Sequence, residues 1–139
     1  MYNRGVAAAQ RGDYETAIRE WRPLARQGNA EAQNMLGFMY QEGTGVPKNA
    51  KTAVKWYRLA AEQGDENTQL GLGVMYFVGE GVKKRDFLYA HMWGNISASL
   101  GVKEGAELRD MAATEMTPAH ISKAQDLARE CVRKKYKGC

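Results

Sequence analysis

Small and apolar residues return along this chain at a spacing of 36 or 37 positions. The recurring positions pair as Gly37 with Gly73, Gly43-x-Gly45-Val46 with Gly79-x-Gly81-Val82, Ala53 with Ala90, and Trp56 with Trp93. A period of this length is typical of solenoids, in which each unit is one helix pair that cannot bury its apolar face alone. The pattern therefore predicts tandem helical hairpins, and the abundant Ala, Leu, Met, Glu, Lys and Arg favour helix throughout.

Capping residues locate the helices within each unit. The alanine that repeats as Ala53 and Ala90 also occurs in the first unit as Ala17. Four residues before these alanines stand Asp13, Asn49 and Asp86, whose side chains accept hydrogen bonds from the first free amides of a helix. A glycine follows each alanine by eleven residues, where it suits the left-handed residue that ends a helix. We therefore expect second helices to begin at residues 14, 50 and 87, in units that span residues 1–28, 29–64 and 65–101.

Residues 102–139 leave the repeat pattern but keep the helical period. A mostly apolar stripe comprises Ala106, Leu108, Met111, Ala112, Glu115 and Met116, and a second stripe comprises Ile121, Ala124, Leu127, Ala128, Cys131 and Val132. Between them, Thr117-Pro118 indicates a new helix, because threonine caps and proline suits the first helical position. We expect a fourth pair that caps the third unit. The predicted fold is one all-α domain, a right-handed solenoid of about four antiparallel helix pairs.

Composition and charge limit the classes of partner that the chain is expected to bind. Of the 139 residues, 44% are apolar and 26% charged, as in globular proteins, and no run of 18 apolar residues predicts a membrane span. The net charge of +4 comes mainly from the C-terminal end, where only Tyr136 interleaves the cations, so we expect a solvated terminus and no nucleic-acid partner. Met1 is followed directly by repeat-like residues, so no export signal is predicted in the sequence itself, although a removed leader stays open.

The candidate chemical motifs favour structural roles. The glycine loops at residues 43–48 and 79–84 resemble phosphate cradles, but they lack a preceding strand and a lysine-hydroxyl pair, and they recur in register as turns do. His91 and His120 are the only histidines, too few for a zinc or nucleophile site with its usual partners. The carboxylates of one turn look like solvent and cap residues rather than an acid-base pair: Glu62, Asp65 and Glu66. We expect no catalytic residue, metal or cofactor.

The repeated block and its second copy resemble the Sel1-like repeat of the tetratricopeptide-like superfamily. The first copy carries Ala32, Leu36-Gly37, Met39-Tyr40, Gly43-x-Gly45-Val46, Ala53, Trp56-Tyr57, Ala60-Ala61 and Gln63-Gly64. The second copy carries Leu72-Gly73, Met75-Tyr76, Gly79-x-Gly81-Val82, Ala90 and Trp93, but has Gly94 where tyrosine is usual and Ser97 where alanine is. The first unit lacks the glycine loop and turns on Arg11-Gly12-Asp13, like an ordinary tetratricopeptide unit. The resemblance is specific for fold and nearly silent about chemistry.

The core is expected where small residues let helix backbones approach. Gly37, Gly73, Ala53 and Ala90 provide that space. The large side chains expected to fill the surroundings are Leu36, Tyr40, Leu72, Tyr76, Trp56 and Trp93.

The two cysteines leave two interpretations open. Cys131 lies on the apolar stripe of the last helix and could be a reduced core residue, or it could bridge to Cys139. A continuous helix would separate the two Cα atoms by about 12 Å, too far for a disulfide, so a bridge requires the helix to end near Lys135. Secreted Sel1-like proteins carry cysteine pairs at this spacing, and a bridge would imply an oxidising compartment.

The resemblance also places a concave groove on the first helix of each unit. The family's groove positions fall on Tyr2, Val6, Glu31, Asn34, Phe38, Gln41, Asn67, Leu70, Val74 and Phe77. Phe38, Leu70, Val74 and Phe77 are then apolar side chains that packing within a pair does not explain, and exposed apolar strips usually mark protein or peptide sites. The alternative is that the fourth pair or a second copy covers them.

The leading hypothesis is a non-enzymatic module that binds a protein or peptide in this groove. The alternatives are a binder of small molecules or cell-wall (peptidoglycan-related) ligands, conceivably with weak hydrolase activity, and a self-associating structural piece; the chain would be a monomer or weak dimer. The resemblance favours a bacterial periplasmic or secreted protein, with a cytoplasmic location as the alternative.

Overall fold

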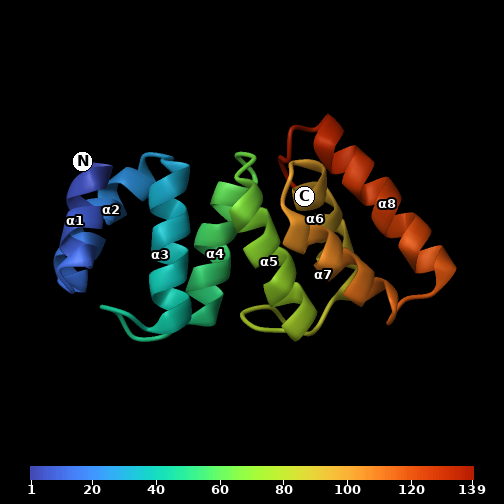
Figure 1. Ribbon diagram of the computed structural model, residues 1–139, viewed down its shortest axis with the longest axis horizontal. Helices are drawn as coiled ribbons and strands as arrows, with labels where there is room; N and C mark the ends of the chain where they lie inside the picture. Colours follow the sequence, from blue (N-terminus) through green and yellow to red (C-terminus); the bar gives the residue numbers. More distant parts are fainter.

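The computed structural model describes residues 1–139 as a row of eight α-helices without strands (Figure 1). The helices are α1 (Tyr2–Gln10), α2 (Tyr14–Arg26), α3 (Ala30–Glu42), α4 (Ala50–Ala61), α5 (Glu66–Val78), α6 (Phe87–Ser99), α7 (Lys103–Ala113) and α8 (Pro118–Arg133). Neighbours in sequence pack against each other from α1 to α7, so the chain forms an all-α solenoid of stacked hairpins. The N-terminus lies at one end of the row, whereas the C-terminus lies back beside α6 and not at the far end, which α8 occupies.

The predicted starts of the second helices are confirmed. Helices α2, α4 and α6 begin at residues 14, 50 and 87. The side chains of Asp13, Asn49 and Asp86 accept hydrogen bonds from amides three residues further on, at 3.1–3.2 Å. Helix α8 begins at Pro118, and the hydroxyl of Thr117 accepts from the amide of His120 at 3.2 Å. Local capping therefore decides these boundaries.

Polar links between consecutive units repeat with the sequence. The guanidinium of Arg22 donates to the Tyr40 hydroxyl at 3.2 Å, and that of Arg58 donates to the Tyr76 hydroxyl at 2.6 Å. The corresponding glutamine links run from buried Gln33 to the carbonyl of Ala25 and from buried Gln69 to that of Ala61. Each link joins the second helix of one unit to the first helix of the next, so it sets how the units stack.

The two repeated tryptophans, Trp56 and Trp93, differ in burial, although both were expected in the core. Trp93 is fully buried, whereas Trp56 is half-buried and lines a surface pocket. The residue that packs on Gly37 is Tyr57, and its counterpart in the first unit is the fully buried Trp21, which packs on Gly5. The prediction that Trp56 fills the core is therefore wrong, because a one-residue step along α4 turns its side chain away from α3.

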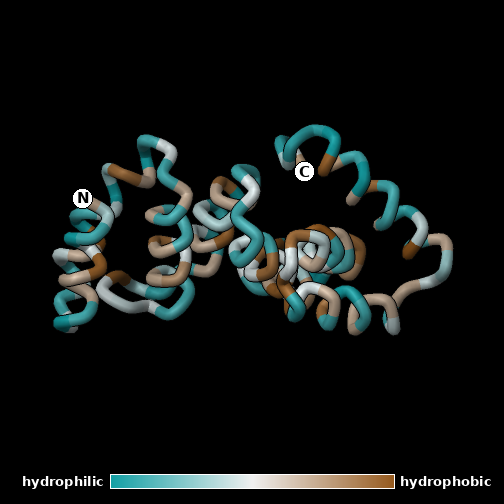
Figure 2. The backbone as a smooth tube through the Cα atoms, turned by 45° about the horizontal axis from the view of Figure 1, so that its top comes forward, coloured by the Kyte–Doolittle hydropathy of each residue, from teal (hydrophilic) through white to brown (hydrophobic).

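In the third unit, Gly94 stands at the position of Tyr57. Its lack of a side chain lets α7 lie directly on α6, where a Cβ at Gly94 would come within 2.8 Å of the Gly105 carbonyl oxygen. Helix α7 also contacts α5, and α8 packs on α6 rather than chiefly on α7. The hydrophobic α6, which carries no charged residue, is thus enclosed by α5, α7 and α8 (Figure 2).

The C-terminal tail folds back onto the solenoid. The structure joins Cys131 and Cys139 by a disulfide with Cα atoms 5.6 Å apart. Helix α8 ends at Arg133, and Lys135 and Tyr136 adopt positive φ, which reverses the chain. The Gly138 amide then donates to a carboxylate oxygen of Glu62 at 2.9 Å, so the tail contacts the turn between α4 and α5.

Removal of the disulfide should destabilise the protein moderately. Cys139→Ser is expected to lower the free energy of unfolding by about 2–3 kcal/mol, because the bridge restricts a short loop of the unfolded chain. Urea unfolding with and without dithiothreitol measures the change, and reductant should affect the wild type but leave the variant as it is. Identical midpoints for the oxidised wild type and the variant would contradict the expectation.

Candidate functional site

The groove positions lie along one side of α1, α3 and α5. We call the surface of these ten side chains the first-helix face: Tyr2, Val6, Glu31, Asn34, Phe38, Gln41, Asn67, Leu70, Val74 and Phe77. Phe38 is 48% exposed and Val74 is 39% exposed, although both are large apolar residues. They occupy the same position in consecutive units, and Leu70 is half-buried one turn before Val74.

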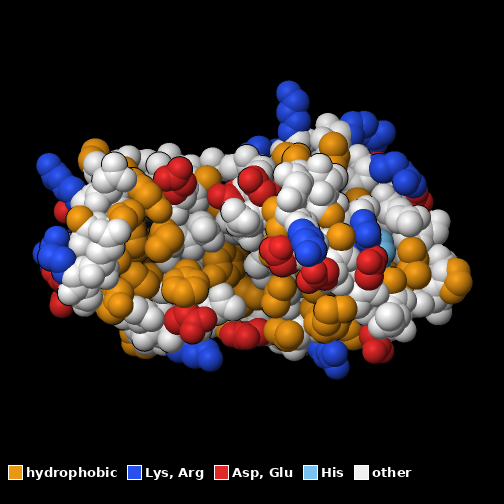
Figure 3. Space-filling model, in the orientation of Figure 1, with side chains coloured by type: hydrophobic (Ala, Val, Ile, Leu, Met, Phe, Trp, Pro, Cys, Tyr) orange, Lys and Arg blue, Asp and Glu red, His pale blue; other side chains and the backbone are white.

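The exposed apolar surface is visible in the space-filling view. Figure 3 shows hydrophobic side chains gathered over α1, α3 and α5, where the molecule is shallowly hollowed. Glu31 and Asn67 are also exposed on the first-helix face, and Asn34 is half-buried. The surface thus combines apolar side chains with a few polar ones, as peptide-binding surfaces do.

Phe77 departs from the expectation. Its ring packs edge-on against Phe87 of the paired helix α6, with centroids 5.4 Å apart, and the Arg85 guanidinium lies over both rings. Packing within the third pair therefore accounts for Phe77. Gln41 is likewise engaged, because its side-chain oxygen accepts from the Tyr57 hydroxyl at 2.7 Å, and burial raises the pKa of Tyr57.

The α1 end of the first-helix face is packed against the core of the first unit. The Tyr2 ring stacks on Trp21 with centroids 5.9 Å apart, and the Trp21 indole donates to the Tyr2 carbonyl at 3.0 Å. Half-buried Val6 packs against the same core cluster. Partial burial, followed by the nearby charge of Glu31, raises the pKa of the Tyr2 phenol, so this end presents a neutral ring beside a carboxylate.

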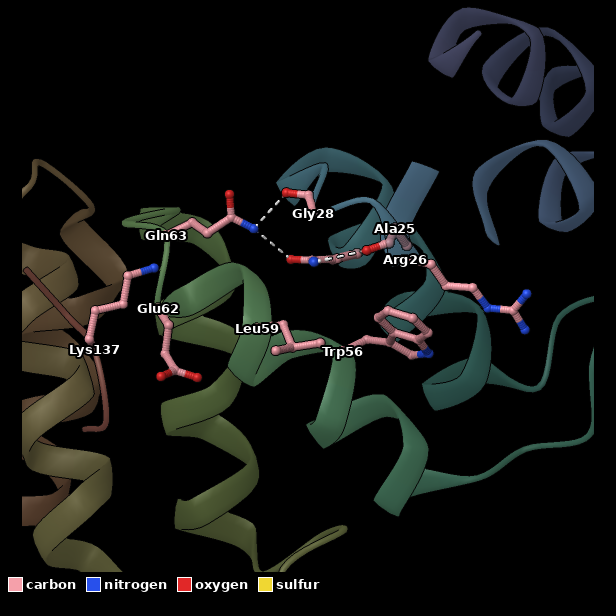
Figure 4. Close-up of a pocket in the computed structure, with 9 residues that line it drawn as sticks. Ala25, Arg26, Gly28, Trp56, Leu59, Glu62, Gln63 and Lys137 are labelled. Atoms are coloured by element: carbon pink, nitrogen blue, oxygen red, sulfur yellow. Dashed lines mark hydrogen bonds between the residues drawn. The ribbon is translucent and has the colours of Figure 1, made fainter. Parts of the chain in front are cut away.

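A separate open pocket of about 550 Å³ lies between the second helices α2 and α4 (Figure 4). Trp56 and Leu59 lie side by side along one wall, with Arg26 toward one end and Glu62 and Lys137 toward the other. On the remaining side, the Gln63 amide nitrogen donates to the Gly28 carbonyl at 2.8 Å and to Gln33 at 2.9 Å. The repeat pattern contained Trp56 but gave no indication of this pocket, since it assigned that side chain to the core.

The titratable groups form no constellation typical of catalysis. Burial, followed by the charge of Arg109, lowers the pKa of His91, whose Nδ1 has no hydrogen-bond partner. His120 is exposed at the start of α8. No group of three or more His, Cys, Asp or Glu side chains is placed to hold a metal ion. None of the eight helices combines the length and apolar character that a bilayer crossing requires.

Stacked helical hairpins with an exposed face along their first helices define the class of α-solenoid repeat proteins. The Sel1 repeat model matches residues 30–65 and 67–102, and the chain therefore belongs to the Sel1 repeat family. This family is generally a non-catalytic protein-interaction scaffold.

Solved structures support the fold over nearly the whole chain. The protective antigen c5321 of uropathogenic Escherichia coli, which displays an SLR fold, is similar with a TM-score of 0.89 and 27% identity over 97% of this chain. A Sel1 repeat protein from Oxalobacter formigenes is similar with a TM-score of 0.76 and 30% identity over 83% of this chain. This chain covers only 30% and 47% of those two chains. No curated protein sequence matches at a significant level.

Proposed function

We propose that this chain is a non-enzymatic binding module that holds a protein or peptide segment on its first-helix face. The observation that carries the proposal is the exposure of Phe38 and Val74 at the same position of two adjacent units. An exposed apolar pair at equivalent positions of adjacent units offers a repeated contact point for an extended ligand. The family's general role as a protein-interaction scaffold agrees with this use.

The protein's own packing does not cover this pair. Helices α7 and α8 pack on α5 and α6 at the far end of the row, so they leave Phe38 and Val74 exposed. Since the cores beneath are already filled by fully buried Leu36 and Leu72, the two exposed side chains contribute little to folding. The apolar surface of these two side chains is then available to contact a partner.

The test uses a random dodecapeptide library displayed on phage. Phe38→Ala with Val74→Ala should reduce the affinity for peptides selected by the wild type by about tenfold or more, because truncation of apolar contact residues removes binding energy. Fluorescence anisotropy of the synthetic peptides measures the affinity. Val132→Ala, which truncates an exposed apolar residue of α8, is the matched control and should bind as the wild type does. Equal affinity of the double variant would refute the proposed site.

The pocket beside Trp56 supports a second candidate, a cell-wall glycan. Sugars stack on aromatic faces, and their hydroxyls both donate and accept hydrogen bonds. This pocket offers an indole beside the Arg26 guanidinium, which donates, and beside the Glu62 carboxylate and the Gln63 side-chain oxygen, which accept. Trp21 and Trp93 are fully buried, so a ligand in the pocket should change mainly the fluorescence of Trp56. Titration with soluble peptidoglycan fragments tests this candidate, and an unchanged emission spectrum would exclude it.

The disulfide supports a location in an oxidising compartment, because such bonds persist there and are rare in the reducing cytosol. We propose a periplasmic or secreted protein on this ground. Separately, we propose that the chain acts as a monomer or weak dimer.

A further inference from the structure

We propose that the partner segment is basic: a peptide whose apolar residues contact Phe38 and Val74 while flanking lysines or arginines face carboxylates at the two edges of the first-helix face. This inference rests on the proposed function and specifies the ligand of the same site. It runs against the net charge of the whole chain, which is +4 and would favour an acidic partner.

The charges are divided between the two sets of helices. The second helices α2, α4, α6 and α8 carry nine basic and four acidic residues, whereas the first helices α1, α3, α5 and α7 carry three basic and six acidic ones. Helices α3 and α5, which bear Phe38 and Val74, contain no lysine or arginine. Within the helices, the positive charge therefore lies mostly away from Phe38 and Val74. The loops that follow α3 and α5 carry the cations Lys48, Lys83, Lys84 and Arg85, and Arg85 lies over the Phe77 ring of the first-helix face.

Carboxylates stand at both ends of the two helices that carry the apolar pair. Glu31 lies in the first turn of α3 and Glu42 ends that helix, whereas Glu66 begins α5 and Glu80 follows its end. In Figure 3, acidic side chains lie at the upper and lower edges of the hydrophobic area over α3 and α5. Burial, followed by the charges of Glu42 and Glu80, raises the pKa of the Tyr57 phenol, so these two carboxylates act on one region although they come from different units.

These four carboxylates have no cationic partner within the chain. The ion pairs of the structure join Arg109 with Asp110, Arg129 with Asp126, and Arg133 with Glu130, all on α7 or α8. A hollow, partly apolar surface focuses the field of unpaired carboxylates and raises the local concentration of cationic ligands. The same field speeds the association of a basic segment and disfavours an acidic one.

The experiment begins with the peptides that the wild type selects from the dodecapeptide library. We expect an excess of lysine and arginine among them, and we expect replacement of these residues by glutamate to weaken binding about tenfold or more. Affinity should also fall as sodium chloride is raised, because the carboxylates lie at the surface.

The matching protein variant combines Glu31→Gln, Glu42→Gln, Glu66→Gln and Glu80→Gln. It should lose about tenfold in affinity for the basic peptides and most of the salt dependence, while its circular dichroism stays that of the wild type. Glu15→Gln with Glu20→Gln on α2 removes two carboxylates from a second helix and should change neither property.

The outcomes separate this inference from the proposed function. Selected peptides that depend on Phe38 and Val74 but are neutral or acidic would overturn the inference and leave the function standing. Failure of the library to yield peptides dependent on these two residues would overturn both. Concentration-dependent dimerisation that the four glutamine substitutions abolish would show that the basic surface of a second copy is the occupant, which also overturns the inference.

Discussion

Trp93→Ala should lower the free energy of unfolding by about 3–5 kcal/mol, the range for truncating a fully buried tryptophan. Trp93 is completely buried in the core cluster formed by α4, α5, α6 and α8, which also includes Leu72, Met75 and Ile96. Its indole nitrogen has no hydrogen-bond partner, so the loss is one of packing rather than of a polar contact. Domains of this size are stable by about 5–15 kcal/mol, so the variant should be largely destabilised.

Urea unfolding followed by far-ultraviolet circular dichroism measures this loss. Trp56→Ala is the matched control, because Trp56 is the counterpart of Trp93 in the preceding unit but is only half-buried. We expect that variant to lose about 1 kcal/mol, a typical value for a partly exposed substitution. Equal losses for the two variants would mean that the two tryptophans are buried alike, contrary to the structure.

Gly105→Ala should destabilise the protein by about 3 kcal/mol, at the upper end of the cost of overpacking. A Cβ at this position would lie 2.6 Å from the Gly94 carbonyl oxygen and 2.7 Å from the Ala98 amide nitrogen. Both are backbone atoms of α6, so the clash cannot be relieved by a change of rotamer. Helix α7 would have to move away from α6, which would loosen the packing of the C-terminal end.

The same substitution elsewhere should have the opposite sign. Gly71 lies within α5, and a Cβ there would meet nothing within 4 Å. Gly71→Ala should therefore raise the free energy of unfolding by about 0.5–1 kcal/mol, because alanine favours the helix and restricts the unfolded chain. Thermal unfolding of the two alanine variants side by side provides the comparison. A Gly105→Ala protein as stable as the wild type would contradict the close approach of α6 and α7.

The candidate site could be located from the sequence only in part. The resemblance to the repeat family assigned Phe38 and Val74 to equivalent groove positions of successive first helices, and the structure exposes both. The same reasoning predicted that Phe77 is exposed like Phe38 and Val74, since it is also apolar and falls on a groove position. Arg85, within the loop that follows α5, and Phe87, the first residue of α6, pack against Phe77, and such contacts depend on how that loop returns the chain.

The charge of the binding surface illustrates the same limit. The composition shows an excess of basic residues, and the sequence order concentrates them near the end of the chain. Which face each charge occupies depends on the stacking of first and second helices into separate rows. The acidic character around Phe38 and Val74 is therefore a property of the assembled solenoid.

By itself, the sequence determined the elements of this protein and their order. Capping residues act within one turn of the helix they begin, so Asp13, Asn49 and Asp86 specified three helix starts without any tertiary information. The period of 36 or 37 residues specified that the elements are repeated hairpins, because neighbouring units must bury similar faces against each other.

Only the tertiary structure decided which of two adjacent aromatic residues enters the core and how the solenoid ends. Trp56 and Tyr57 are both large enough to fill the space over Gly37, and the rotation of α4 against α3 selected Tyr57. At Gly94, which departs from the repeat, α7 lies so close to α6 that a Cβ would contact its backbone, and α8 also packs on α6. These choices depend on close packing between segments distant in the chain, where a displacement of one side chain changes which neighbours fit.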